Sequence, residues 1–476
     1  MSVTVAAVDL GASSGRVLVG RFGGDETTLR EVHRFANHPI RPDGVLRWDL
    51  PALLRGVLDG LRKAEQLAGP LDSIGVDSWA VDYGTLDADG TPGPDPVHYR
   101  NGDTTEAVAT VHETLGAERL FAATGIQHLP FNTVFQLVAR RPSGEQLLIA
   151  DLVNAWLCGV RGTEATNAST TALLDPRTRD WAAAVLDGLG LGRPFPPLHE
   201  PGAVLGPVQP ERLRAAGLSG HPVVVAVPSH DTAAAVAGVP AEGDNFAFVC
   251  TGTWALVGVE LPAPVLTPAA RAANFSNELG VDGTVRFLRN VTGLWLLQEC
   301  VRDWSAGGEP VDLGGLVAAA RTAGPGALVD VQDPAFLEPG DMPGRIVDAA
   351  RRSTGRRLTS RGEVVRCVLD SVAVAIGQAV QQAVDLSGHR ADVVHVVGGG
   401  VANPLFCQLI ADAVRRPVQA GPIEAAAWGN AVTQAQVLGA VPPTLAAARA
   451  AIRRAQPPTS YHPAASVRGS VPSAAT

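Results

Sequence analysis

Apolar and polar positions alternate with two different periods along this chain, and the changes of period mark the predicted elements. Residues 5–9 and 16–21 are short apolar runs joined by a turn rich in glycine and serine, which predicts a β-hairpin. Residues 50–67 carry apolar side chains at helical spacing, and residues 361–386 continue that spacing over a longer stretch. Runs of both kinds alternate in both halves of the chain, which predicts an α/β fold with layered helices and strands in each half.

The same hairpin pattern occurs a second time halfway along the chain. Residues 246–260 again form an apolar run, a turn of glycine and threonine, and a second apolar run. Such turns expose backbone N–H groups and hydroxyls that can accept phosphate oxygens as ligands. Two of them indicate two similar halves that bind a nucleotide, although two unrelated hairpins would give the same local pattern.

Several further elements follow from the periodicity. Residues 223–227 predict a buried strand, and Ser229, which follows it, is expected to be the N-cap of the next helix. The pattern also predicts one helix over residues 104–124, another over residues 290–304, and a strand over residues 79–86.

The turn at residues 238–243 is taken as the domain boundary. We therefore expect domains at residues 1–239 and 240–453, followed by a disordered tail at 454–476 that is rich in proline, serine and alanine.

Composition narrows the function classes. The net charge of −9 and the lack of a basic stripe argue against a nucleic-acid partner, and no apolar run is long enough to predict a membrane span. The N-terminal residues do not resemble a signal peptide, and the five cysteines stand apart among apolar residues, so a cytoplasmic protein with free thiols is expected. Lys63 is the only lysine, which excludes a Walker A loop. A phosphotransferase of this composition must hold ATP with backbone amides, hydroxyls, arginine and metal ions.

Polar residues at predicted strand ends are the candidates for chemistry. Asp231 follows a predicted strand and opens a helix, where its carboxylate can accept a proton from a substrate hydroxyl or merely cap the helix. Neighbouring residues in a chain point apart, so His230 and Asp231 are not expected to form a dyad. Asp9 ends the first strand and can hold Mg²⁺ through water, or bond to its own turn. The triple glycine at 398–400 fits close approach of a nucleotide or a plain tight turn.

Two segments combine aromatic rings with polar side chains, which is what sugar recognition requires. They are residues 78–82, with a tryptophan and an aspartate, and residues 130–132, with a phenylalanine and an asparagine. Core aromatics beside turn residues would give the same pattern in either segment.

In this order, these segments resemble the FGGY family of carbohydrate kinases, and within it the members that phosphorylate L-rhamnulose. The resemblance covers nearly the whole chain apart from the tail. The segments that carry it are residues 8–16, 125–133, 229–233, 252–254, 277–278, 290–298, 397–400 and 420–425.

The resemblance implies two ribonuclease-H-like (actin/hexokinase-type) domains with the active site in the cleft between them. The first domain would bind mainly sugar and supply the first phosphate loop, and the second would bind mainly nucleotide. The reaction would be phosphorylation of L-rhamnulose by ATP with Mg²⁺, in a monomer or homodimer that needs no nucleic acid or membrane.

Residue roles carry over by position in the same way. Asp231 would be the general base, and Asp9 would assist the metal. The sugar would contact Ala80, His230, Asp231, Thr232 and Asn290. ATP would contact Ala12, Ser13, Ser14, Gly15, Arg16, Thr253, Gln298 and Gly399.

One departure from the family pattern bears on the substrate. Ala80 stands where similar members have glycine, and its methyl group would point at or near the sugar. A kinase for L-fuculose or a pentulose therefore stays open as an alternative. A non-catalytic ATP-binding protein of the actin and heat-shock type, and a dinucleotide-dependent oxidoreductase, are further alternatives from other classes.

Overall fold

The structure is a computed structural model that describes residues 2–24, 26–306 and 311–464 of the chain. It divides into two compact units. Unit 1 comprises Met1–Asp244, Val259–Arg289 and Glu424–Pro457, and unit 2 comprises Asn245–Gly258, Asn290–Ile423 and Pro458–Thr476. Unit 1 thus contains two segments from beyond the predicted boundary at residue 239.

Unit 1 is built on a mixed six-stranded sheet. The strand order is β13 (Val204–Pro207), β14 (Val223–Val225), β6 (Ser73–Ser78), β1 (Val3–Leu10), β2 (Ser14–Gly23) and β3 (Glu26–Ala36). Strands β1, β6 and β14 are parallel, whereas β2, β3 and β13 pair antiparallel with their neighbours. The carboxyl ends of the three parallel strands therefore lie at one edge of the sheet, where α/β folds place ligands.

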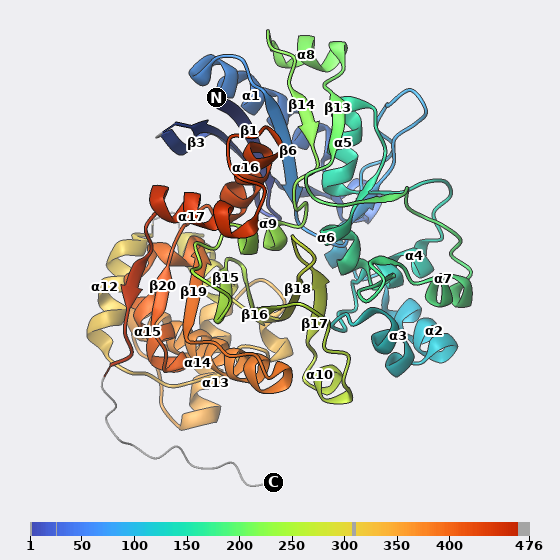
Figure 1. The fold of residues 1–476 in the computed structure, drawn as a ribbon. Helices are drawn as coiled ribbons and strands as arrows, with labels where there is room; N and C mark the ends of the chain where they lie inside the picture. The colour runs from blue at the N-terminus through green and yellow to red at the C-terminus, as the bar shows by residue number, and fades with distance from the viewer. Residues whose placement is uncertain (1, 25, 307–310, 465–476) are drawn as a thin grey trace. The chain divides into compact units, whose positions relative to one another are not determined.

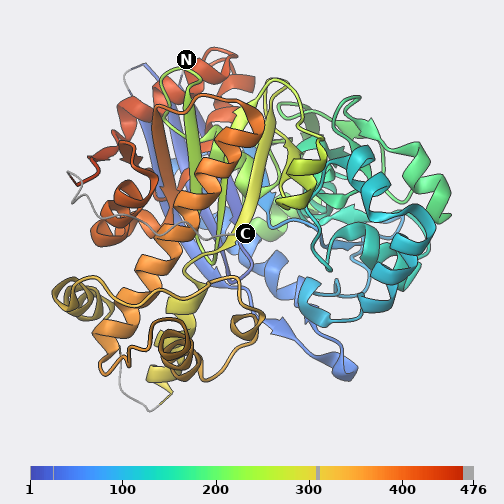
Figure 2. The same ribbon diagram turned by 90° about the horizontal axis from the view of Figure 1, so that it is seen from below.

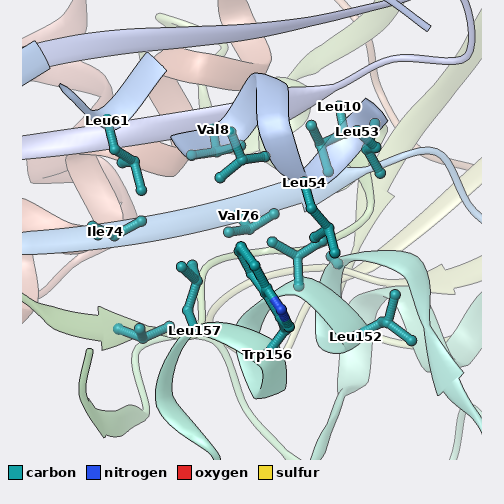
Figure 3. Packing of buried hydrophobic residues seen from close by; sticks show 14 of the residues in the cluster. Val8, Leu10, Leu53, Leu54, Leu61, Ile74, Val76, Leu152, Trp156 and Leu157 are labelled. Carbon is teal, nitrogen blue, oxygen red and sulfur yellow. The ribbon is translucent and has the colours of Figure 1, made fainter. Parts of the chain in front are cut away.

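Both faces of β1 are buried, which explains why this strand is almost continuously apolar. Along β1, Ala6, Val8 and Leu10 join the core formed with α1 (Leu50–Ala68) and α5 (Ile149–Cys158) (Figure 3). The alternate residues Val3, Val5 and Ala7 join a second core with α16 (Ala425–Val437) and α17 (Leu445–Ala455). Figures 1 and 2 show these red C-terminal helices beside the blue N-terminal strands.

A helical layer with its own apolar core completes unit 1. Gly116, with a φ of 81°, divides the single helix predicted over residues 104–124 into two, because the left-handed conformation cannot continue a helix. The larger helices of this layer are α2 (Thr105–Leu115), α3 (Ala117–Thr124), α4 (Thr133–Arg140) and α7 (Ala183–Leu189). Short helices of unit 1 are α6 (Ala165–Ala168), α8 (Pro210–Ala216), α9 (Asp231–Ala237) and α10 (Pro268–Ala272).

Two-stranded ladders link the loops of unit 1. They are β4 (Pro39–Ile40) with β5 (Arg47–Trp48), β7 (Tyr83–Gly84) with β8 (Leu147–Leu148), β9 (Thr163–Glu164) with β12 (Leu198–His199), and β10 (Leu174–Asp175) with β11 (Asp180–Trp181). The strand predicted over residues 79–86 is wrong except at β7, because Val81 adopts a φ of 69° that interrupts extended backbone.

A second sheet has the strand order β17-β18-β16-β15-β19-β20-β21. Its strands are β17 (Ser276–Leu279), β18 (Val285–Thr292), β16 (Trp254–Leu261), β15 (Phe246–Thr251), β19 (Val393–Gly398), β20 (Val418–Ala420) and β21 (Thr459–Tyr461). Strand β17 belongs to unit 1, and β15, β19, β20 and β21 belong to unit 2. The helices of unit 2 are α11 (Trp295–Ser305), α12 (Leu313–Ala323), α13 (Met342–Thr354), α14 (Arg361–Ser387) and α15 (Pro404–Val414). The α/β layers predicted for both halves are confirmed.

Two predictions in the C-terminal half need correction. The helix predicted over residues 290–304 starts only at Trp295, because residues 290–292 finish β18. The disordered tail is wrong for its first part, since α17 continues to Ala455 and β21 pairs with β20. Residues 465–476 of that tail lie outside the described residues.

In the ranges that the structure describes, no helix is both long and apolar enough to cross a membrane.

Candidate active site

The candidate site of unit 1 lies where β1, β6 and β14 end. The register of β1 and β6 places Asp9 beside Asp77. At the end of β6, Ser78 N donates to Ser229 O at 2.9 Å, and Ser78 forms a parallel bridge with His230. The parallel sheet thus brings Asp9, the residues after β6 and the His230-Asp231 segment to one edge, although the sequence separates them widely.

Asp9 is buried among charged groups. Its Oδ2 lies 3.0 Å from Arg16 Nη2, and Arg16 also forms an ion pair with Glu424. Burial raises the pKa of Asp9 to about 6, against the opposing effect of the Arg16 guanidinium, and the charges of Asp231 and Glu424 raise it further. The carboxylates of Asp231 and Glu424 therefore both act on the Asp9 carboxyl at this edge of the sheet.

Asp77 adds a second buried carboxyl beneath Asp9. Asn430 Nδ2 donates to Asp77 Oδ2 at 2.7 Å, while no hydrogen bond from the described residues reaches Asp77 Oδ1. Burial raises the pKa of Asp77 well above its usual range, the charge of Asp9 raises it further, and the Asn430 hydrogen bond lowers it.

This edge fits a hydrated magnesium ion. Mg²⁺ binds through one or two carboxylates and keeps several waters. The Asp9 carboxylate and the orphaned oxygen of Asp77 offer that chemistry, and a divalent cation would offset the repulsion among the carboxylates. Among the described residues, no group of three or more acidic, histidine or cysteine side chains is placed to hold a metal ion by itself.

The turn between β1 and β2 is held by backbone bonds and leaves its tip exposed. Gly11 N donates to Ser14 O at 3.0 Å, and Asn37 Nδ2 donates to Gly11 O at 3.0 Å. Ala12 and Ser13 are exposed at the tip, and Ser14 is half-buried. The predicted phosphate-binding residues 12–16 are therefore together on one fixed turn.

Gly15 is required on this turn for packing. A side chain there would meet the ring of Phe35 at 2.3 Å. Arg16 follows it and is already paired with Asp9 and Glu424, so any ligand must share the guanidinium with these carboxylates.

Ser229 is held by a buried carboxylate and is not the helix cap that the sequence predicts. The N-cap of α9 is His230, which makes no side-chain capping bond. Ser229 N and Ser229 Oγ both donate to Glu164 Oε2, at 2.9 and 2.8 Å. The same Glu164 carboxylate accepts bonds from Thr166 and Asn167, so it fixes the backbone that leads into His230 and Asp231.

The expectation that His230 and Asp231 point apart is wrong. His230 Nε2 lies 3.3 Å from Asp231 Oδ1, and Thr232 Oγ1 donates to the same oxygen at 3.0 Å. The Asp231 side chain remains 36% exposed. The Asp231 carboxylate is thus oriented at one oxygen and still accessible to a ligand.

Ala80 lies on a strained turn after β6. Val81 adopts a φ of 69°, which is a genuine outlier for a β-branched residue. Its carbonyl oxygen accepts bonds from Thr133 Oγ1 at 2.8 Å and from Gln136 Nε2 at 3.3 Å. Strain of this kind persists where surrounding contacts enforce it, as at ligand sites. The half-buried Ala80 is thereby set in one position.

Asp82 organises the aromatic residues beside this turn. Its fully buried carboxyl accepts bonds from Trp48 Nε1 at 2.7 Å, Trp79 Nε1 at 3.2 Å and Gln136 Nε2 at 3.1 Å. Burial raises the pKa of Asp82 to about 6, and these hydrogen bonds oppose that rise. Trp48 stacks on His98 with ring centroids 4.0 Å apart. Trp48 and Trp79 belong to the hydrophobic core beside α1, and Asp82 is completely buried, so at residues 78–82 the structure shows the core alternative.

The turn of the second hairpin, in unit 2, is also closed by a glycine N–H, but over a shorter span than the first. Gly252 N donates to Trp254 O at 2.8 Å across the turn between β15 and β16. Thr253 Oγ1 donates to Gln298 Oε1 on α11 at 3.2 Å, and Thr253 O accepts the N–H of Gly293. The predicted ATP contacts Thr253 and Gln298 are therefore together.

The triple glycine follows β19, which pairs in parallel with β15. Gly398 has a φ of 89°, and a side chain there would meet Thr251 O at 2.5 Å. Gly400 N donates to Thr251 Oγ1 at 3.1 Å. Gly399 between them faces open space, so the predicted nucleotide contact is accessible. Asn290 lies at the end of β18 in unit 2 and not at a helix start.

Several organising residues carry no signal in the sequence. They are Asp77, Gln136 and Arg286, because a buried polar residue is recognised only when its partners are known. Glu164 has one local signature, since a glutamate before Ala-Thr-Asn is placed to accept from the backbone N–H groups that follow.

The chain is similar to known proteins over most of its length. Residues 4–238 match the N-terminal domain of the FGGY family of carbohydrate kinases, and residues 247–437 match its C-terminal domain. The chain is 37% identical to the rhamnulokinase of Enterococcus faecalis, over 96% of this chain and 94% of that protein. It is 40% identical to the rhamnulokinase of Pectobacterium carotovorum, over 92% and 88% of the two chains, and 34% identical to that of Bacillus subtilis, over 90% and 89%.

Solved structures share the fold at low sequence identity. A gluconate kinase from Lactobacillus acidophilus superimposes with a TM-score of 0.76 at 15% identity, covering 98% of this chain and 94% of that one. A xylulose kinase from Rhodospirillum rubrum gives 0.75 at 19% identity, covering 98% and 94%. The expected two-domain, actin/hexokinase-like architecture is confirmed. The chain belongs to the FGGY family of carbohydrate kinases.

Proposed function

We propose that this kinase transfers the γ-phosphoryl group of ATP to the C1 hydroxyl of L-rhamnulose, giving L-rhamnulose 1-phosphate. The observation that carries the substrate is identity of 34–40% with rhamnulokinases over at least nine-tenths of this chain. The family matches over residues 4–238 and 247–437 include both hairpin turns, the Ser229–Thr232 segment and the strained turn at Ala80.

Asp231 is the proposed general base. Its Oδ1 is bonded to Thr232 and faces His230, which leaves Oδ2 of a partly exposed side chain for the C1 hydroxyl. In phosphoryl transfer the transition state is loose, so positioning of the hydroxyl matters more than early proton removal. General-base assistance contributes about 10²–10⁴-fold to the rate.

The remaining roles follow from chemistry at each strand end. The exposed turn at Ala12 and Ser13, with Arg16 beside it, would contact the transferring phosphate, and Thr253, Gln298 and Gly399 would contact the nucleotide. Asp9 would hold Mg²⁺ through water, and when bound this ion neutralises charge on the phosphate oxygens. Ala80, His230, Thr232 and Asn290 are proposed to contact the sugar.

The test is ADP release by the purified protein with MgATP on L-rhamnulose, L-fuculose, D-xylulose and L-ribulose, each compared with no sugar. Strong selectivity for L-rhamnulose supports the proposal and makes Ala80 a tolerated variation. Preference for another ketose keeps the reaction and moves the substrate, and Ala80→Gly then shows whether the methyl group sets that preference.

The role of Asp231 is tested separately with Asp231→Asn. This variant keeps the side-chain shape but replaces the basic carboxylate with a neutral amide. We therefore expect kcat to fall by about 10²-fold or more, with sugar binding retained. Normal turnover by Asp231→Asn would refute the assignment.

A further inference from the structure

We propose that Glu278 and Arg286 are positioning residues for phosphoryl transfer, because together they keep the Nε2–H of His230 directed at Asp231 whether the ring is neutral or charged. The inference rests on the proposed function only in that Asp231 is the base. Glu278 and Arg286 act on Asp231 through the ring of His230.

The geometry begins with the pairing of β17 and β18. Glu278 and Arg286 are directly opposite each other in this antiparallel ladder, and Arg286 Nη1 lies 3.0 Å from Glu278 Oε2. Arg286 is completely buried, and its Nε donates to Leu279 O at 3.1 Å. The pair is therefore held by backbone pairing as well as by its own contacts.

The imidazole of His230 lies between this pair and the proposed base. Its Nδ1 is 3.3 Å from Glu278 Oε2 and 3.4 Å from Arg286 Nη2, and its Nε2 is 3.3 Å from Asp231 Oδ1. His230 is itself buried, so water does not compete for these ring nitrogens as it would at the surface.

The two partners of Nδ1 give the ring one orientation in both protonation states. When the ring is neutral, Nδ1 accepts from the Arg286 guanidinium, which can only donate, and the proton stays on Nε2. When the ring is charged, the Nδ1–H donates to the Glu278 carboxylate, which can only accept while ionised. The other neutral tautomer would turn an N–H toward the Arg286 guanidinium and a bare Nε2 lone pair toward the Asp231 carboxylate. These two repulsive contacts outweigh its one favourable contact, that of the Nδ1–H with Glu278.

As a consequence, the two carboxylate oxygens of Asp231 have different roles. Asp231 Oδ1 receives the Thr232 hydroxyl and the His230 Nε2–H, so it is occupied in either state of the ring. Oδ2 is then the oxygen that accepts the proton of the substrate hydroxyl.

The ionised state of Glu278 agrees with this arrangement. Burial would raise the pKa of Glu278, but the Arg286 guanidinium and the bond with His230 outweigh it and hold that pKa below its usual range. A buried arginine–carboxylate pair contributes little net stability relative to apolar residues of similar size. Stability therefore does not account for the Glu278–Arg286 pair, whereas its contact with His230 beside Asp231 gives the pair a positioning role.

The first measurement is the tautomer of His230 in the wild-type protein. Histidine labelled with ¹⁵N reports which ring nitrogen carries the proton, and a His230→Gln variant assigns the signal. We expect the Nε2–H form when the ring is neutral. An Nδ1–H form in the wild type overturns the proposal, and this result does not depend on whether any Glu278 or Arg286 variant folds.

The second measurement is the turnover of Glu278→Gln, which keeps the shape of the side chain but removes its charge. Because this variant loses the charge that holds the Arg286 guanidinium beside Nδ1, we expect kcat to fall about ten- to a hundredfold and a mixture of His230 tautomers to appear. The matched control is Glu118→Gln, which removes an exposed carboxylate 2.7 Å from Arg271 in the same unit and should leave both readouts unchanged.

The outcomes separate this inference from the proposed function. If no sugar stimulates ADP release, or if Asp231→Asn turns over normally, the proposed function fails whatever the ring tautomer. If the wild type is active and Asp231→Asn is not, while a folded Glu278→Gln retains wild-type kcat and a single His230 tautomer, only the positioning role of Glu278 and Arg286 is overturned.

Discussion

Glu164→Gln should destabilise unit 1 and reduce turnover together, although Glu164 is neither exposed nor a candidate ligand contact. Its fully buried carboxylate accepts five hydrogen bonds, of which Oε2 accepts four and Oε1 accepts only that of Thr166 N at 2.8 Å. A glutamine can keep its carbonyl oxygen in the Oε2 position. Its amide NH₂ then faces the Thr166 N–H, which leaves two buried donors opposed.

The cost follows from these contacts. A buried donor without an acceptor costs about 1–3 kcal/mol, and the bonds that remain lose the charge that makes each worth about 1.5–3 kcal/mol. Because Ser229 contributes two of these bonds, we expect a total loss of about 3–5 kcal/mol in the free energy of unfolding. At about 2 °C per kcal/mol for a large domain, Tm should fall by about 6–10 °C.

The assay combines thermal unfolding with sugar-stimulated ADP release, both on Glu164→Gln and on a matched control. Glu200→Gln is that control, because it removes an exposed carboxylate 2.6 Å from Arg179 in the same unit. Surface ion pairs contribute about 0–1 kcal/mol, so Tm and kcat of the control should change little. Ser229→Ala removes only the Oγ bond and should lie between the two.

A particular result would refute this reasoning. If Glu164→Gln unfolds within about 1 °C of the wild type and keeps its kcat, then the carboxylate neither satisfies buried donors nor fixes the backbone before Asp231. If Tm falls while kcat, measured well below the unfolding transition, is unchanged, then Glu164 stabilises the fold but its bonds to Ser229 do not position Asp231 for turnover.

Two further predictions use the same structure. Asp82 should hold a proton below about pH 6 and be ionised above it, because burial raises its pKa. The indole N–H signals of Trp48 and Trp79 should therefore shift downfield together as the pH rises through about 6. Asp82→Asn should abolish that common transition. Gly398→Ala should raise the KM for ATP or unfold unit 2, because the φ of 89° and the 2.5 Å approach to backbone at Gly398 exclude a methyl group. Gly399 faces open space, so Gly399→Ala should bind ATP normally. Equal behaviour of the two variants would contradict this account.

The sequence determined those features that depend on neighbouring residues. The hairpin turns, the helix at Leu50–Ala68 and the helix at Arg361–Ser387 follow from apolar periodicity. The order of the motifs along the chain, by its resemblance to known members, predicted the family, and both domain matches confirm it. The errors fell where a single backbone angle interrupts the pattern, as at Val81 and Gly116.

The tertiary structure alone decided which polar groups meet. Glu424 pairs with Arg16 across 408 positions, Ser229 bonds to Glu164 across 65, and Glu278 reaches His230 from a strand of a different sheet. Periodicity is a local property and carries no information about such pairs, because a partner is set by strand order, register and packing. The sequence thus placed Asp231 at a strand end, and the fold supplied the buried carboxylates and the arginine that orient it.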